Sequence, residues 1–353
     1  MAKAEEKTPS VFSASQLVER SKSRDVVTAC LSADIGFGGG IPLGCTVLFG
    51  GKAKSGKTTT VLQYAANAQL KYGCEIYYCN VEGRLDHKTL SQIQNLDLEK
   101  MHVVMGPSIE DKDGNIIGYR KMSSQEWWDK IGSLIASKPR SIIIVDSVSA
   151  LSEEAEMASG MGYMSRGGLQ KLEAQFQRQY GDLIMPNGVT LFLLAQIQAN
   201  TSGYGDPLQI KCGNAIKHLA DAIVFIKGIE KWKPTANGRI LGHDMVWKIE
   251  HSPLGPPLID TKVPLRYGQG LDYVGDIATN AMQWEVIRAS GAWYILPFKE
   301  DDDKFAYVEI PESKEEQKGF IKIQGEENLN KWLKENPVAF DRVNEEVRKR
   351  IFF

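Results

Sequence analysis

The sequence predicts an α/β protein whose core is a mainly parallel sheet covered by helices, followed by a small α+β C-terminal domain. From about residue 26 to residue 273, short apolar segments alternate with helical ones, which is typical of a parallel sheet with helices on both faces. A length of 353 residues suits one large α/β domain with a small appendage.

The composition is that of an ordinary globular protein with almost balanced charge. The chain has 42 basic and 44 acidic residues, so any binding to nucleic acid must come from local patches and not from the net charge. Its 5 cysteines form no CxxC pair, which favours reduced thiols over disulfides or a zinc site. The polar amino terminus is unlike a signal peptide, and no apolar run approaches the ~20 residues that span a bilayer. We therefore expect a soluble, cytoplasmic protein that does not bind a membrane.

The expected strands and helices follow from apolar runs and turn signals. Residues 58–70 are expected to form a helix, and residues 109–119 a hairpin that turns at Asp113-Gly114. The last helix presents an apolar face made of Phe340, Val343, Val347 and Ile351. The expected strands are residues 47–49, 75–81, 142–145, 189–194, 222–226 and 245–249.

Three parts are expected along the chain: residues 1–25, 26–276 and 277–353. The first is a polar arm with too few apolar residues for a core of its own, so it either stays solvated or packs on a neighbouring subunit. The second is the large α/β core, and the third is the small C-terminal domain. An acidic run at residues 300–303 is interpreted as solvated surface.

Residues 51–58, with the sequence GKAKSGKT, fit the pattern G-x-x-x-x-G-K-[ST] between a strand and a helix. In this pattern backbone N–H groups surround phosphates, while Lys57 reaches the β- and γ-phosphates and the Thr58 hydroxyl binds Mg²⁺. The first turn of the following helix adds its positive dipole. We therefore predict that ATP and Mg²⁺ bind here. The expected nucleotide contacts are Gly51, Lys52, Ala53, Lys54, Ser55, Gly56, Lys57, Thr58 and Thr59.

Three polar residues stand at the ends of predicted strands. Asp146 ends the apolar run 142–145, where a carboxylate can hold a metal ion beside bound phosphate. Glu82 is placed to orient or deprotonate an attacking water, although position alone is equally consistent with a solvated glutamate. Gln196 can bind a γ-phosphate and pull on the loop that follows, or can be an ordinary polar residue at a strand end.

Two glycine-rich stretches, residues 159–168 and 200–213, are expected to be mobile loops. Long loops inside a compact domain are usually functional or disordered. Tyr204, at the tip of the second loop, can stack on nucleic-acid bases or simply pack within the loop. The region around both loops is slightly more basic than acidic, which is consistent with a surface that follows phosphates.

Ordered motifs along the chain resemble the RecA family of DNA recombinases. They are residues 31–44 with the phosphate loop, YCNVEGRLD at 78–86, IIIVDSVSAL at 142–151, AQI at 195–197, GNAIK at 213–217, YGQGLD at 267–272, GAWY at 291–294 and KWLKENP at 331–337. The resemblance covers about residues 26–353. It implies a RecA-like P-loop ATPase core.

The resemblance also implies roles for single residues. Glu82 becomes the group that activates water, Asp146 becomes the metal-associated carboxylate, and Gln196 becomes the γ-phosphate sensor. Lys57 and Lys248 complete the catalytic set, with Lys248 reaching into a neighbour's ATP site, and Asp86 and Tyr267 contact the nucleotide. The implied DNA contacts in and beside the two loops are Met164, Arg166, Gly167, Gln198, Tyr204, Lys211, Gly213 and Asn214.

The chain departs from the bacterial pattern at several positions. Glu250 replaces a second lysine, His218 replaces an aromatic residue, and Thr89 replaces a tyrosine near adenine. Residues 295–319 resemble an insertion after GAWY. These differences suggest a divergent branch such as the T4-phage-type recombinases.

The expected function is that of an ATP-dependent recombinase that forms helical filaments on single-stranded DNA. The filament would pair with homologous duplex DNA and exchange strands, and loader or single-strand-binding proteins are further expected partners. A non-catalytic recombination mediator and a hexameric RecA-fold helicase are the alternatives.

Overall fold

The computed structural model describes residues 13–16, 24–151, 168–200, 207–234, 237–256, 259–302, 304–313 and 315–352. Its centre is a sheet of nine strands in the order β15-β14-β13-β12-β3-β9-β8-β4-β5. The strands are β3 (Thr46–Gly51), β4 (Ile76–Asn80), β5 (Met101–Val104), β8 (Ile142–Asp146), β9 (Thr190–Ala195), β12 (Ala222–Lys231), β13 (Gly242–His251), β14 (Ile259–Arg266) and β15 (Gly270–Leu271). The expected strands are all present in this sheet.

The sheet is mainly parallel, as expected. Neighbouring strands from β12 through β3, β9, β8 and β4 to β5 run parallel. The remaining pairs, β12–β13, β13–β14 and β14–β15, are antiparallel. Because the parallel strands point the same way, their carboxyl ends meet at one edge of the sheet.

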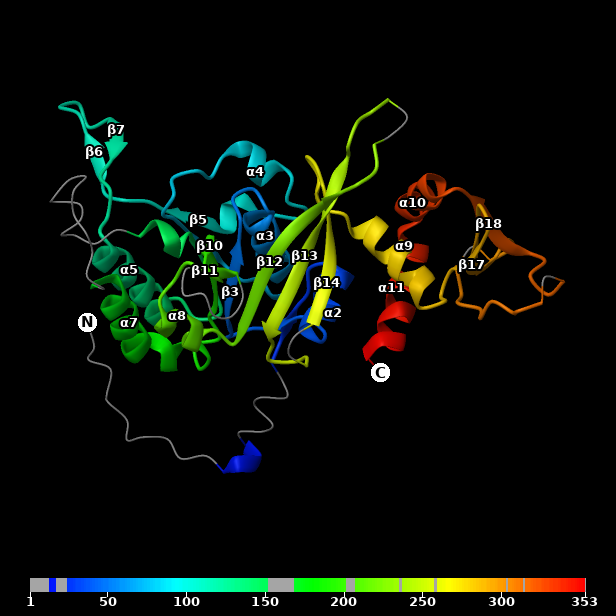
Figure 1. The fold of residues 1–353 in the computed structure, drawn as a ribbon, viewed down its shortest axis with the longest axis horizontal. Coiled ribbons are helices and arrows are strands. Elements are labelled where there is room, and N and C mark those ends of the chain that lie inside the picture. Colours follow the sequence, from blue (N-terminus) through cyan, green and yellow to red (C-terminus); the bar gives the residue numbers. More distant parts are fainter. Residues whose placement is uncertain are drawn as a thin grey trace.

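Helices cover both faces of this sheet (Figure 1). In β3, Val47 and Phe49 pack into one apolar core, and Leu48, which points to the opposite face, packs into a second. The first core includes side chains of α2 and α3, and the second includes side chains of α5, α7 and α8. The helices of the core are α2 (Leu31–Phe37), α3 (Lys57–Tyr72), α4 (His87–Ser91), α5 (Ser124–Ser137), α7 (Gly168–Ile184) and α8 (Asn214–Leu219), with short 3₁₀ helices η1 (Leu98–Lys100) and η2 (Val148–Ala150).

In the part of the chain that the structure describes, three small two-stranded sheets accompany the large one. The expected hairpin around Asp113-Gly114 is formed by β6 (Ser108–Glu110) and β7 (Ile116–Tyr119), and it projects from the domain in Figure 1. β1 (Val26–Val27) pairs with β2 (Ile41–Pro42). β10 (Ile197–Ala199) pairs with β11 (Leu208–Ile210), so the second glycine-rich stretch includes a strand whose Ile210 side chain is buried.

The carboxyl-terminal part has an apolar core of its own, to which Leu31 of α2 also contributes. Helix α9 (Tyr273–Gln283) leads into it and includes the expected domain boundary at Ile277. The other elements are β16 (Arg288–Ser290), β17 (Trp293–Lys299), β18 (Phe320–Gln324), α10 (Glu326–Glu335) and α11 (Pro337–Phe352). Val343 and Val347 of α11 are fully buried, as the apolar face of the last helix predicts.

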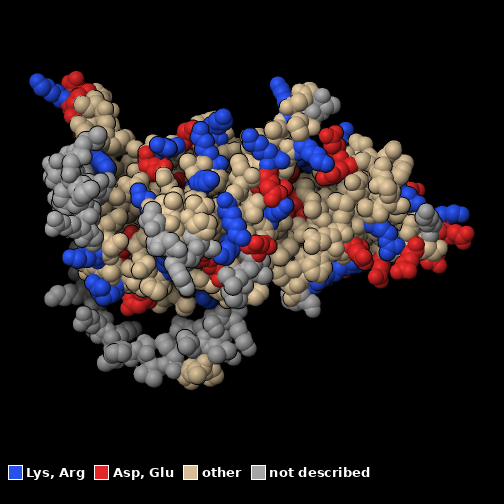
Figure 2. All heavy atoms as spheres, viewed as in Figure 1, with Lys and Arg blue, Asp and Glu red and all other residues tan. Residues whose placement is uncertain are grey.

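Residues 295–319 are not simply an inserted loop. Their first five residues belong to β17, where Leu296 and Phe298 are fully buried. The rest connects β17 to β18, and Figure 2 shows acidic side chains gathered on this end of the molecule. Glu300 and Asp301 are exposed, in agreement with the interpretation of the acidic run as solvated surface.

Candidate active site

A cavity of about 460 Å³ lies at the carboxyl ends of the parallel strands. β3, β4, β8 and β9 all end at this edge, and the segments that follow them supply much of its lining. A larger cavity of about 1000 Å³, between the β12–β13 turn region and α10, does not include the phosphate loop. The expected site residues that line the smaller cavity are Ala53, Lys54, Ser55, Gly56, Lys57, Thr58, Thr59, Glu82, Asp146, Gln196 and Tyr267.

The glycine-rich turn between β3 and α3 encloses the Lys57 side chain. Its Nζ donates to the carbonyl oxygens of Gly51 and Lys52, at 2.9 and 2.8 Å. Burial lowers the pKa of Lys57, while the nearby carboxylates of Asp146 and Glu82 oppose this shift. The buried Oγ of Ser55 has no hydrogen-bond partner among the described residues. A buried ammonium group beside a buried, unpaired hydroxyl fits a bound phosphate.

The turn requires glycine at position 56, where the backbone has a φ of +89°. A Cβ atom at this position would lie 2.4 Å from Sδ of Met245, which is buried on β13. Gly56 directly precedes α3, so the close approach places the first turn of this helix at the cavity.

Asp146 and Thr58 form a pair of oxygen ligands suited to a hard cation. Oγ1 of Thr58 and the hydroxyl of Tyr78 both donate to Oδ2 of Asp146, at 2.8 and 2.6 Å. Burial raises the pKa of Asp146, and these two hydrogen bonds oppose the rise. Hydroxyl and carboxylate oxygens fit Mg²⁺, which usually keeps its remaining positions for phosphate and water. Within the described ranges, no group of three His, Cys, Asp or Glu side chains could hold a metal by itself.

Glu82 lies at the centre of a second set of contacts. Its Oε1 accepts hydrogen bonds from Oγ of Ser147 at 2.6 Å and from Nε2 of Gln196 at 3.4 Å. Nε of Arg84 lies 4.0 Å from its Oε2. The carboxylate therefore faces the cavity, held by the residue that follows β8 on one side and by the residue that follows β9 on the other. This arrangement can orient a water molecule beside a phosphate.

Several cavity residues were not found from the sequence: Tyr78, Asn80, Arg84, Leu85, Gln92, His243 and Leu265. His243 is buried on β13, and its Nδ1 lies 3.2 Å from the hydroxyl of Tyr267. Its Nε2 has no partner among the described residues, and burial lowers its pKa. The alternation of buried residues on β13 could have revealed which side of the strand His243 faces, since Met245 and Trp247 share that side.

Four residues expected at the nucleotide site lie outside this cavity lining: Gly51, Lys52, Asp86 and Lys248. Asp86 is the N-cap of α4, where Oδ1 accepts a hydrogen bond from the backbone N–H of Thr89 at 2.7 Å. Thr89 itself is a lining residue. Lys248 is on β13, opposite Phe225 of β12 and Asp260 of β14, and does not line the cavity.

The described DNA-contact candidates lie around the β10–β11 hairpin. Gln198, Lys211 and Asn214 are exposed, whereas Gly213 is buried. The backbone N–H of Gly213 donates to Oε2 of Glu173 on α7 at 2.9 Å. Four further candidates, Met164, Arg166, Gly167 and Tyr204, lie outside the described residues.

A family model described as the RecA N-terminal domain matches residues 10–272 of the chain. The chain belongs to the RecA family. The match spans the phosphate loop, Glu82, Asp146 and Gln196, and all the lining residues of the cavity at the sheet edge fall within it.

Relatives with the name Protein RecA agree with this assignment over almost the whole chain. The protein from Sulfurovum sp. (strain NBC37-1) is 27% identical over 332 residues, which cover 93% of this chain and 84% of the relative. The protein from Rubrobacter xylanophilus is 28% identical over 332 residues, or 94% of this chain and 85% of its own length. The protein from Clostridium botulinum (strain Eklund 17B) is 28% identical over 329 residues, which cover 92% of this chain and 81% of the relative.

As a RecA-family protein, the chain is an ATP-dependent DNA recombinase that acts in DNA repair, and its enzymatic activity is that of a DNA-dependent ATPase. It binds nucleotide and DNA and forms filaments. None of the helices in the described part of the chain is both long and apolar enough to cross a membrane.

Proposed function

We propose that this RecA-family protein forms a helical filament on single-stranded DNA, with ATP and Mg²⁺ at the boundary between adjacent copies. In this filament it pairs the bound strand with homologous duplex DNA and exchanges strands. Base pairing reads the sequence, so the protein needs little sequence preference of its own. The proposed place of action is the cytoplasm, with loader or single-strand-binding proteins as partners.

The residues expected at the nucleotide site have proposed roles in ATP binding and hydrolysis. The backbone of residues 51–59 surrounds the phosphates, and Lys57 neutralises charge on the β- and γ-phosphates. Thr58 and Asp146 hold Mg²⁺, which supplies charge stabilisation at the transferring phosphate. Glu82 orients and deprotonates water, and Gln196 binds the γ-phosphate. Tyr267 contacts the nucleotide base, with Asp86 as a further contact.

Lys248 is the proposed contribution from the neighbouring copy. It lies outside the cavity lining of its own chain, as a residue that completes another subunit's site would. A lysine there adds positive charge where negative charge develops during phosphoryl transfer. Glu250, two residues further along β13, replaces a second cation, so the proposed contact depends on Lys248 alone.

The two glycine-rich loops are the proposed DNA-binding segments. The first carries Met164, Arg166 and Gly167, and the second carries Tyr204 between strands β10 and β11. Basic groups such as Arg166 would follow the phosphates, and Tyr204 would stack on bases. The described candidates beside the second loop are Gln198, Lys211, Gly213 and Asn214.

The contact between Glu82 and Gln196 carries this proposal. One carboxylate oxygen contacts both Ser147, directly after the metal-associated Asp146, and Gln196, directly before the β10–β11 hairpin. A change at the γ-phosphate thus has a direct structural connection to the second DNA loop. The complete set of Lys57, Thr58, Glu82, Asp146 and Gln196 also argues against a non-catalytic mediator.

We further propose that the chain is divided into an arm (residues 1–25), a core (26–276) and a C-terminal domain (277–353).

The test is the ATPase rate of the purified protein with and without single-stranded DNA, together with strand exchange between homologous DNA molecules. We expect DNA to stimulate hydrolysis and the protein to exchange strands without another recombinase. Electron micrographs should show open helical filaments on DNA, where a helicase would form closed rings. A protein that stays monomeric with ATP, Mg²⁺ and an oligonucleotide, and leaves the oligonucleotide unbound, would overturn the proposal.

A further inference from the structure

The hydroxyl group of Ser149 connects the two strands of the β10–β11 hairpin at its base. Ser149 lies in η2, three residues after Asp146. Its Oγ accepts a hydrogen bond from the backbone N–H of Gln196 at 2.8 Å and donates to the carbonyl oxygen of Lys211 at 2.9 Å. The backbone N–H of Lys211 donates directly to the carbonyl oxygen of Gln196, also at 2.8 Å.

These contacts form one rung of the hairpin. The register pairs Ile197 with Ile210 and Ala199 with Leu208, so its continuation pairs Gln196 with Lys211. Opposed residues of an antiparallel hydrogen-bonded pair normally exchange two N–H···O bonds. Here the bond from the N–H of Lys211 to the carbonyl oxygen of Gln196 is direct. The second bond, from the N–H of Gln196 to the carbonyl oxygen of Lys211, is replaced by the Ser149 hydroxyl, which contacts both groups. The side chain of Ser149 is thus inserted into the backbone ladder.

The same short segment also contacts the nucleotide cavity. Ser147 donates to Oε1 of Glu82, and the Gln196 side chain donates to this same oxygen. Within residues 147–149, Ser147 therefore holds Glu82 and Ser149 holds the base of the hairpin.

At the opposite end of the hairpin, Asn200 is paired with Pro207. Its N–H donates to the carbonyl oxygen of Pro207, and no second bond is returned because proline has no N–H.

We propose that Ser149 is a positioning residue that couples the nucleotide cavity to the second DNA loop. While its hydroxyl bridges Gln196 and Lys211, a displacement of Gln196 at the γ-phosphate moves both strands of the hairpin together. Without the bridge, only the direct bond from the N–H of Lys211 to Gln196 connects the two strands at this position, so Lys211 follows a displacement of Gln196 less closely. This inference deepens the proposed function and rests on it.

The size of the effect follows from the energy of hydrogen bonds at a partly exposed site. Water can replace part of what the hydroxyl supplies, because Ser149 is only half-buried. Loss of such a bridge shifts a two-state equilibrium about 3- to 10-fold. That is too little to unfold the protein but enough to weaken coupling between two sites.

Three variants test the hydroxyl separately from the backbone. Ser149→Ala removes both hydrogen bonds, and Ser149→Thr retains a hydroxyl. Ser141→Ala is the matched control, since Ser141 lies just before β8 at the opposite edge of the sheet and its Oγ donates to the carbonyl oxygen of Lys138 at 2.7 Å. Each protein is titrated with a fluorescent single-stranded oligonucleotide and Mg²⁺, once with a non-hydrolysable ATP analogue and once with ADP. The ratio of the two affinities measures the coupling.

We expect Ser149→Ala to lower this ratio about 3- to 10-fold, with the affinity for the ATP analogue in the absence of DNA unchanged. Ser149→Thr and Ser141→Ala should give the wild-type ratio. Amide hydrogen exchange gives an independent measurement. The backbone N–H of Gln196 should exchange faster in Ser149→Ala, whereas that of Lys211 keeps its direct bond and should change less.

The outcomes separate this inference from the proposed function. A wild-type protein whose DNA affinity is the same with both nucleotides overturns the proposed function and the inference with it. Nucleotide-dependent binding in the wild type with an unchanged ratio in Ser149→Ala overturns the inference alone. Equal losses in Ser149→Ala and Ser149→Thr would also overturn it, because the hydroxyl would not be responsible.

Discussion

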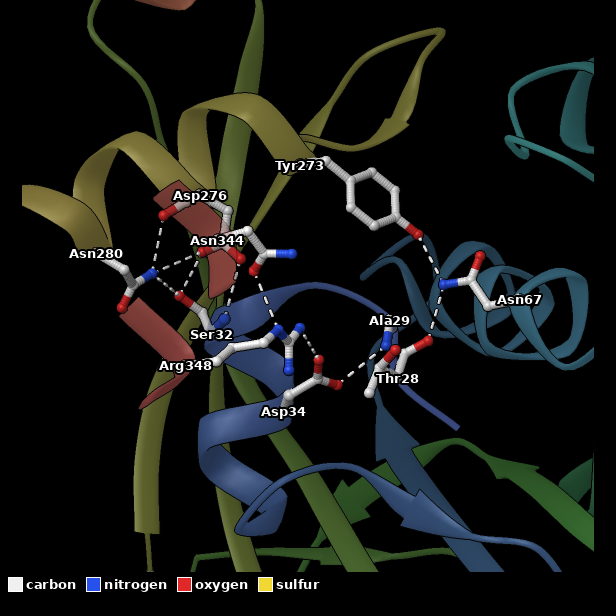
Figure 3. Close-up of polar contacts among 10 residues, drawn as sticks. All are labelled: Thr28, Ala29, Ser32, Asp34, Asn67, Tyr273, Asp276, Asn280, Asn344 and Arg348. Carbon is white, nitrogen blue, oxygen red and sulfur yellow. Dashed lines mark hydrogen bonds and ion pairs between the residues drawn. The ribbon is translucent and has the colours of Figure 1, made fainter. Parts of the chain in front are cut away.

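Arg348, on the last helix, donates a hydrogen bond from Nη2 to Oδ2 of the fully buried Asp34 in α2, at 2.7 Å. The other oxygen of Asp34 accepts from the backbone N–H of Ala29 at 3.0 Å. Beside this pair, Asp276 of α9 accepts from the backbone N–H of Ser32 at 2.9 Å (Figure 3). A buried charged network therefore joins α2, α9 and α11, and fastens the C-terminal module to the core.

The first prediction concerns Arg348→Met, which leaves Asp34 buried without its cation. Burial raises the pKa of Asp34 to about 7, and the Arg348 guanidinium opposes that rise. A carboxyl group whose pKa is raised on folding stabilises the folded state while it is protonated. This contribution is complete below the pKa that the group has in the unfolded state, and it is lost as pH rises through about 7. The variant should therefore lose about 3–5 kcal/mol of unfolding free energy at pH 8 and less at pH 5, where Asp34 can be protonated.

Urea unfolding at both pH values measures this effect. The matched control is Arg342→Met on the same helix, where the guanidinium pairs with Glu345 at the surface, 3.1 Å away. This control should cost less than about 1 kcal/mol at either pH. Equal losses in the two variants, or a loss in Arg348→Met that does not grow with pH, would contradict the interpretation.

The sequence predicts which residues meet at the cavity because those residues follow local rules. A phosphate loop has fixed spacing, and polar residues at the ends of parallel strands must meet at one edge, so Lys57, Asp146 and Glu82 could be placed without coordinates. Tyr78 could not, because a tyrosine within a buried strand is indistinguishable from a core residue. The pair Asp34–Arg348 is separated by 314 positions, and only the docking of α11 on α2 brings it together.

The second prediction tests the hydrogen bond from Tyr78 to Asp146. Tyr78→Phe removes the 2.6 Å contact to Oδ2 and leaves the ring in its buried position. Because this bond holds a carboxylate expected to bind Mg²⁺, the concentration of Mg²⁺ for half-maximal ATPase should rise about 10-fold. Activity at saturating Mg²⁺ should be largely restored.

The matched control is Tyr77→Phe on the same strand, whose hydroxyl donates to Glu75 at 2.5 Å and not to the cavity. It should leave the Mg²⁺ requirement unchanged. If Tyr78→Phe had the wild-type requirement, the hydroxyl would not orient Asp146.

The third prediction separates hydrolysis from binding at Glu82. Glu82→Gln retains a side chain that can contact Ser147 and Gln196 but cannot accept a proton from water. ATP hydrolysis should fall by about 10²–10⁴-fold, while DNA binding with ATP is retained. Single-turnover ATPase and oligonucleotide titration measure the two properties, and simultaneous loss of DNA binding would mean that Glu82 is structural.

The fourth prediction concerns Glu173, a buried carboxyl group that joins α7 to the end of the second glycine-rich stretch. Oε2 accepts the Gly213 N–H, whereas Oε1 has no hydrogen-bond partner among the described residues. Burial raises the pKa of Glu173 to about 7, and the Gly213 N–H opposes the rise. Stability from this group is therefore present below the ordinary value of 4.5 and is lost as pH rises through about 7.

Glu173→Gln removes this titration and keeps an oxygen that can accept from Gly213. Its unfolding free energy relative to the wild type should increase by about 2–3 kcal/mol between pH 5 and pH 8. This comparison cancels any constant cost of burying the amide, because that cost is the same at both pH values. Urea unfolding at the two pH values measures the difference. Lys171→Gln, which removes an exposed charge from the same helix, should not reproduce the increase, and a pH-independent difference in Glu173→Gln would show that Glu173 does not retain its proton on folding.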